Sequence, residues 1–208
     1  MHDRRINGET FTFGNASSLY MSAMTWWDHE TRSVWSQPWG RAIEGNLKGV
    51  ELFLLPSQVT TWESWRSQHP NTLVMTNDSA LMPNFKVPFY SGFVIGVTLA
   101  GDAKAFRYDE VAQTKLVNDQ LGNVPILIWA ADNSYHTYIR DIGTQTLTFV
   151  WENDQLVDVE TGSTWNVVRG LAEDGPLRGQ VLQALPSLTA YEDHWFDFYP
   201  ESVVWGQE

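Results

Sequence analysis

The chain has no cysteine, no long apolar run and no excess of positive charge, and each absence removes a class of function. Without cysteine in 208 residues there is no disulfide, no thiolate nucleophile and no Cys-ligated zinc. No stretch reaches the roughly 18 apolar residues of a membrane-spanning helix, so no membrane span is predicted. Asp and Glu number 25 against 13 Lys and Arg. The resulting net charge of −12 would repel a phosphate backbone, and no nucleic-acid partner is predicted.

The first residues lack a further feature, the apolar core of a secretory signal peptide. Two possibilities therefore stay open: a cytoplasmic protein, or a piece of a longer chain. The residues alone do not fix the compartment.

Apolar and aromatic residues, in contrast, are plentiful. Hydrophobic residues make up 43% of the chain and charged residues 18%, which is the balance of a chain that folds. Tryptophan occurs 11 times. Large aromatic side chains favour pleated, half-buried surfaces, so they indicate strands as readily as a ligand site.

One motif occurs twice and defines an internal repeat. Its two copies are Asp28-His29-Glu30-Thr31-Arg32-Ser33-Val34-Trp35 and Asp158-Val159-Glu160-Thr161-Gly162-Ser163-Thr164-Trp165. Without gaps, residues 28–75 align with 158–205, and 17 of the 48 positions are identical. Chance would give about three at background residue frequencies. Upstream, residues 4–13 match 140–149, which implies a six-residue insertion in the first copy and predicts a longer hairpin there.

The first copy is incomplete. Residues 93–136, which open the second copy with an apolar run, have no match in the first. We expect a first repeat at 1–75 with its front missing, a linker at 76–92 and a complete second repeat at 93–208, packed as one globular unit. Strands without neighbours leave open edges, so a protein partner or self-association is expected at the open sheet edge of the first repeat.

The expected fold class is mainly β with a few short helices. We expect two copies of one β-rich unit, related by a pseudo-twofold, that form a barrel or a sandwich. Residues 52–55 predict a strand that ends at Pro-Ser, followed by a helix near 58–68 with Ser57 as its N-cap. The equivalents in the second copy are a strand at 181–185, a helix near 188–198 and Ser187.

A family resemblance covers nearly the whole chain. In the first copy it is carried by the segment 19–56, with Gly40-Arg41-Ala42-Ile43 after the motif, and by Thr60-Thr61-Trp62, Trp65 and His69-Pro70. In the second copy it is carried by Val94-Ile95-Gly96-Val97, Ala103-Lys104-Ala105, Val117-Asn118-Asp119, Leu147-Thr148-Phe149 and the segment 158–186. With these segments the chain resembles the uncharacterised prokaryotic family DUF3179, a domain of unknown function.

The resemblance implies a fold and a location. Members of the family look like extracytoplasmic proteins or lipoproteins with both repeats complete, and their first repeat contains a Cys-Pro-Leu-Cys-like motif. The equivalent place in the second copy here is Trp129-Ala130-Ala131-Asp132-Asn133, without cysteine. The resemblance thus implies an extracytoplasmic setting and no particular activity.

The repeated motif supplies candidate ligands for a metal or another ligand. They are Asp28, Glu30, Asp158 and Glu160. Paired carboxylates beside hydroxyls could bind a hard cation through oxygen, or act as acid and base. The alternative is turn chemistry, because Asp, Thr and Ser side chains bond their own backbone. The turn is favoured, since Asp and Ser are common turn formers; no cofactor is predicted, and a divalent cation stays open.

Histidine and tryptophan supply the other candidates. No two of the five histidines have the spacing of a zinc site. His136 falls near the place of the family's cysteine motif and is the histidine we would test first as a ligand. Trp26, Trp27 and Trp39 are candidates for an aromatic interface. Because adjacent strand residues face opposite sides, one of Trp26 and Trp27 should point away from its core.

These observations favour a non-catalytic binding or protein-interaction module, and the resemblance implies an extracytoplasmic or envelope assembly as its setting. One alternative is a metal-assisted hydrolase that uses the motif carboxylates. Another is a purely structural domain. No Gly-x-Ser-x-Gly elbow accompanies the serines, so nucleophilic hydrolysis has no sequence support.

Overall fold

The computed structural model describes residues 1–74 and 92–207, and it is mainly β. Its strands form several separate sheets, and no sheet in the described residues closes into a barrel. Of the two expected forms the barrel is therefore not found, while a sandwich and a pseudo-twofold relation stay predictions. None of the helices in that part of the chain has the length and hydropathy needed to cross a membrane. The predicted linker, 76–92, lies outside the described residues apart from Gly92.

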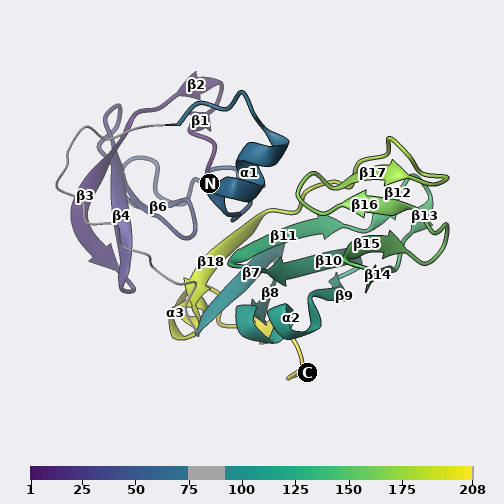
Figure 1. Ribbon diagram of the computed structural model, residues 1–208. Helices are drawn as coiled ribbons and strands as arrows, with labels where there is room; N and C mark the ends of the chain where they lie inside the picture. Colours follow the sequence, from purple (N-terminus) through teal and green to yellow (C-terminus); the bar gives the residue numbers. More distant parts are fainter. Residues whose placement is uncertain (75–91, 208) are drawn as a thin grey trace.

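The first repeat contains a four-stranded antiparallel sheet and a two-stranded ribbon (purple to blue in Figure 1). Its elements are β1 (Arg5–Ile6), β2 (Glu9–Thr10), β3 (Phe13–Tyr20), β4 (Ala23–Asp28), β5 (Val34–Ser36), β6 (Arg41–Glu44) and α1 (Trp62–Gln68). The β3–β4 hairpin turns at Met21 and Ser22, both of which have positive φ, as a type I′ hairpin turn requires. β3 has 8 residues where its counterpart at 149–152 has 4, so the predicted longer hairpin is confirmed.

The second repeat contains three larger sheets and a two-stranded ribbon. Its elements are β7 (Phe93–Leu99), β8 (Asp102–Arg107), α2 (Tyr108–Thr114), β9 (Leu116–Leu121), β10 (Val124–Ala131), β11 (Ser134–Ile139), β12 (Asp141–Ile142), β13 (Gln145–Thr146), β14 (Phe149–Glu152), β15 (Gln155–Asp158), β16 (Thr164–Asn166), β17 (Leu171–Asp174), β18 (Ser187–Tyr191), α3 (Glu192–Phe198) and β19 (Val203–Val204). The sheets have the orders β18-β7-β8-β19, β11-β10-β9 and β14-β15-β16-β17. The last strands of the chain thus pair with the first strands of this repeat.

The buried tryptophan of each motif lies at the centre of a hydrophobic cluster. Trp35 and Trp165 are both buried, each in the cluster of its own repeat. Phe13 meets Trp35 edge-on at 5.4 Å between ring centroids, and Phe149 meets Trp165 in the same way at 5.6 Å. The surroundings of the two tryptophans are therefore alike, as the repeat predicts.

The helix predictions near the Pro-Ser steps are wrong at their starts. Ser57 does not cap α1, because Thr61 is the N-cap and its side chain accepts a hydrogen bond from the Ser64 amide. Ser187 begins strand β18, and α3 follows only at Glu192. Backbone pairing overrides the cap signal here, since all five residues of β18 pair with β7. The predicted strands at 52–55 and 181–185 are reduced to isolated bridges.

Candidate binding site

In the first repeat the Asp-x-Glu-Thr-x-Ser-x-Trp motif folds into a turn around a fully buried aspartate. Asp28 accepts hydrogen bonds from the amide and the hydroxyl of Thr31, and from the indole N–H of Trp35 at 2.8 Å. Burial raises the pKa of Asp28, but the hydrogen bonds from Trp35, Thr31 and the Ser33 backbone outweigh it, so the net pKa lies below its ordinary value. The carboxylate stays ionised and organises the turn.

The second repeat makes the same bonds. Asp158, also fully buried, accepts from the amide and hydroxyl of Thr161 and from the indole of Trp165 at 2.9 Å. The Ser163 hydroxyl accepts the amide of Leu177 at 3.0 Å, as the serine of the first motif does with its own loop. The motif is therefore a structural turn that occurs twice.

The glutamates of the motif are exposed and bind neighbouring backbone. Glu30 accepts the amide of Thr12 through both carboxylate oxygens, at 3.0 and 3.1 Å. Glu160 accepts the amide of Thr148 at 2.7 Å. No group of three or more His, Asp or Glu suited to a metal occurs in residues 1–74 and 92–207. The contacts support the turn interpretation, and a divalent cation at these carboxylates stays the untested alternative.

His136 lies on β11, inside the second repeat, with no exposed surface. Its ring lies 5.4 Å from that of Trp129 and 6.4 Å from that of Tyr138, between centroids. Neither ring nitrogen has a hydrogen-bond partner in the described part of the chain. Burial lowers the pKa of His136 to about 4, so the imidazole is neutral at pH 7.

The three candidate tryptophans take different places. Trp27 stacks on His29 at 4.2 Å, and the Arg32 guanidinium lies 4.5 Å from its ring centre. Trp26 packs against the first-repeat core instead, so the two neighbours do point apart. Trp39 joins the repeats.

The contact that Trp39 makes fixes one repeat against the other. Its indole N–H donates to the carbonyl oxygen of Phe198, in α3, at 2.9 Å. The two rings also meet edge-on at 5.2 Å. This predicted interface residue therefore serves an interface within the chain.

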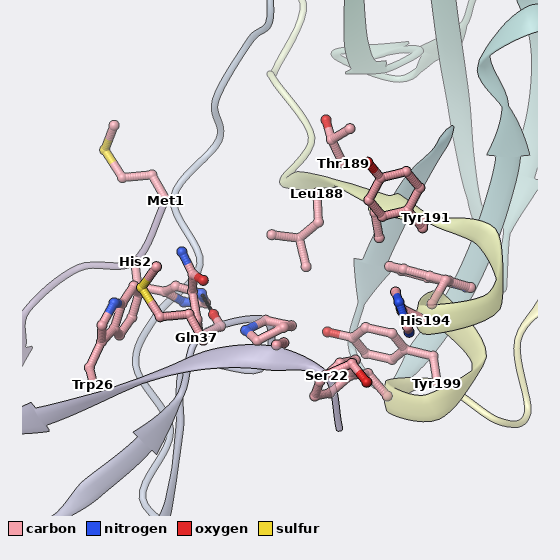
Figure 2. Close-up of a pocket in the computed structure, with 16 residues that line it drawn as sticks. Met1, His2, Ser22, Trp26, Gln37, Leu188, Thr189, Tyr191, His194 and Tyr199 are labelled. Carbon is pink, nitrogen blue, oxygen red and sulfur yellow. Dashed lines mark hydrogen bonds between the residues drawn. The ribbon is translucent and has the colours of Figure 1, made fainter. Parts of the chain in front are cut away.

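Beside this contact, residues of both repeats line an open pocket of about 550 Å³ (Figure 2). Its apolar and aromatic lining consists of Met1, Ala23, Met24, Trp26, Pro38, Leu188, Ala190, Tyr191, Trp195, Phe198 and Tyr199. Its polar lining consists of His2, Ser22, Gln37, Thr189 and His194. Most of the surface inside the pocket is apolar, and the few polar groups lie on both sides of it.

Hydrogen bonds hold the walls of the pocket in place. Trp195 is buried, and its indole N–H donates to the Ser202 hydroxyl at 2.8 Å. Gly96 of β7 leaves room for this ring, because a Cβ there would lie 2.0 Å from it. On the first repeat, His2 donates through Nε2 to the Gln37 carbonyl oxygen at 2.9 Å. Burial lowers the pKa of His2, so its ring is neutral at pH 7.

One wall of the pocket is the edge of a sheet. β18 pairs with β7 on one side, and among the described residues no strand pairs with its other side. Leu188, Thr189, Ala190 and Tyr191 of this strand line the pocket. The pocket thus offers unpaired backbone as well as apolar side chains.

Sequence reasoning found only part of this site. It singled out Trp26, and it missed the β18 residues. Its one relevant signal was the lack of a first-copy match to 93–136, which predicted an open edge in the first repeat. There β3 is a sheet edge with no strand on its outer side in the described residues. The edge at the pocket, however, belongs to the second repeat.

Fold and site together define a mainly β protein of two related repeats with an apolar pocket between them. The chain belongs to the family described as Protein of unknown function (DUF3179), whose model matches residues 1–93 and 90–202. Two adjacent matches agree with a repeat family and confirm the resemblance given by the motifs. No curated protein and no solved structure matches the chain.

Proposed function

We propose that this protein is a binding module that takes an apolar or aromatic group into the pocket between its repeats. The observation that carries the proposal is the pocket itself, about 550 Å³ in volume and mostly apolar inside. Ligand pockets are typically about 300–1,000 Å³, apolar, with a few placed polar groups. The polar groups at this pocket include His2, Thr189 and His194.

The fixed walls favour binding. The Trp39–Phe198 hydrogen bond joins the two repeats, and the Trp195–Ser202 hydrogen bond fixes the Trp195 ring that lines the pocket. A pocket that is ordered before the ligand arrives loses less side-chain freedom on binding. The hydrolase alternative has no comparable support, because the motif carboxylates already bind backbone and indole groups. An extracytoplasmic or envelope setting is the part of the proposal that rests on the family resemblance alone.

A fluorescent apolar dye, anilinonaphthalene sulfonate, tests the proposal directly. Leu19 and Met24 face each other across the β3–β4 hairpin, and both are exposed, but only Met24 lines the pocket. We expect one dye to bind per chain, Met24→Asp to weaken it about tenfold or more, and Leu19→Asp to leave it unchanged. Absence of binding, or equal loss in both variants, would contradict the proposal.

A further inference from the structure

We infer that the ligand of this pocket is an extended polypeptide strand that pairs with the open edge of β18. This inference rests on the binding function proposed above and names its partner class. Addition of a strand to an exposed sheet edge is a common mode of peptide recognition. The chain itself contains the precedent.

The precedent is strand β11, whose outer edge pairs with segments of both repeats. Within the second repeat, Leu185 donates its amide to the Thr137 carbonyl oxygen at 2.9 Å, and Ile139 donates to Gln183 at 2.8 Å. Two residues earlier in β11, the segment that pairs with the strand belongs to the first repeat. There the Tyr135 amide donates to the carbonyl oxygen of first-repeat Val59, also at 2.9 Å, in an antiparallel bridge.

The first repeat reproduces the first half of this arrangement. Leu55 donates its amide to the Met1 carbonyl oxygen at 2.8 Å, and Asp3 donates to Phe53 at 2.8 Å. These are the aligned positions of the second-repeat pairs. The second half is not reproduced in the described residues: Thr189, which aligns with Val59, has no strand opposite it on that side.

The edge of β18 at Thr189 is held in place by contacts with β7 and with the second-repeat core. Thr189 pairs with Ile95 of β7, and its hydroxyl lies 2.9 Å from that of Tyr135 in the second-repeat core. Met1 and β18 both line the pocket, and Figure 2 shows Met1 on one side of the gap and Leu188 and Thr189 on the other. A strand laid antiparallel to β18, as β11 lies against Val59, would therefore fill the pocket.

The neighbouring side chains define what such a strand must carry. The residue opposite Thr189 points to the same face as Thr189, and the residues before and after it point to the opposite face. That face carries Leu188 and Ala190, so the flanking residues should be apolar. The net charge of −12 favours basic residues at the ends of the peptide.

A synthetic peptide tests this pairing. It has the sequence of residues 132–139, with valine in place of Ser134 and His136 and two lysines added at each end. Its matched control carries a methyl group on the amide nitrogen of the residue derived from Tyr135, which removes one donor and keeps every side chain. In fluorescence anisotropy we expect one peptide to bind per chain, and methylation to weaken binding about tenfold or more.

The outcomes separate the two proposals. A peptide that fails to bind while the dye binds at Met24 overturns the strand inference and leaves the binding function standing. Failure of both probes overturns both. Equal affinity of the methylated control shows contact through side chains only and overturns strand pairing. The other outcome, in light scattering, is a dimer that the peptide dissociates. That result would assign the open edge of β18 to a second copy of the chain and overturn a separate peptide as its occupant.

Discussion

The two repeats share their motif turns and differ at their sheet edges. In each repeat, an Asp carboxylate accepts hydrogen bonds from residues no more than seven positions away, so the turn depends on its own segment alone. The edges depend on distant segments. In the second repeat Asn118 of β9 covers the edge of β14, where it exchanges two hydrogen bonds of 2.8 Å with the backbone of Phe149.

In the first repeat the counterpart of this edge, β3, has no such cover within the described residues. The hydrogen bonds within each motif turn are therefore retained in both copies, and the copies diverge where pairing needs a distant strand. The unpaired edges lie at such places, and β18 at the pocket is one of them.

The largest expected effect comes from removing the buried carboxylate of either motif. Asp28→Ala and Asp158→Ala each leave a buried indole N–H and a part-buried threonine amide without their acceptor, which should cost about 3 kcal/mol. Urea unfolding measures the loss, and similar costs in the two repeats are expected. Glu30→Ala, at an exposed position, is the control and should cost less than 1 kcal/mol, an approximate bound for surface contacts. A neutral Asp158→Ala beside a costly Asp28→Ala would break the equivalence.

The titration of Asp28 should show in the same measurements. Because its pKa is lowered in the folded state, ionisation of Asp28 favours folding above the ordinary carboxyl pKa. That contribution is lost as the pH falls through the lowered folded pKa. The Asp28→Asn variant should lack this part of the acid sensitivity.

The next effect concerns His136, which lies in the stretch with no first-copy match. Its pKa is about 4 in the folded protein and near 6.5 when unfolded, so below pH 6.5 the unfolded state binds a proton that the folded state does not. Stability should therefore fall between pH 6.5 and pH 4, by on the order of 2–3 kcal/mol. His136→Phe should flatten this fall in urea unfolding curves. His194→Gln, at a half-exposed site, should keep it, and parallel pH profiles for wild type and His136→Phe would count against the buried neutral imidazole.

A smaller loss of stability is expected when the edge of β14 loses its contact with Asn118. Asn118→Ala removes both bonds to the Phe149 backbone and should cost about 1–2 kcal/mol. Hydrogen exchange of the Phe149 amide should then approach that of Phe13, its counterpart on the open edge of β3. An unchanged Phe149 amide would show that something other than Asn118 protects it.

How far the sequence predicts this molecule depends on the range of the interactions. The longer hairpin and the turn at Asp28 follow from residues close together, and the structure bears them out. The helix starts do not follow, because Ser187 has good capping chemistry and yet enters β18 to pair with β7. The pocket does not follow either, since Met24 and Leu188 come to line one pocket only through the packing of distant segments.

The smallest effect tests the one position where the two turns differ in backbone chemistry. Arg32 has a φ of 61° where Gly162 has 73°, so arginine holds a left-handed conformation that costs about 1 kcal/mol in a non-glycine residue. Its guanidinium over Trp27 offsets roughly 0.5–1 kcal/mol of this. Arg32→Gly should thus stay within about 0.5 kcal/mol of wild type. Gly162→Arg should cost about 1 kcal/mol, because Val157 stands where the first repeat has Trp27 and offers no ring to stack on. Thermal unfolding of the two variants decides the matter: if Arg32→Gly gains about as much stability as Gly162→Arg loses, the Trp27 contact contributes nothing, and the two turns differ in energy by the strain of the arginine alone.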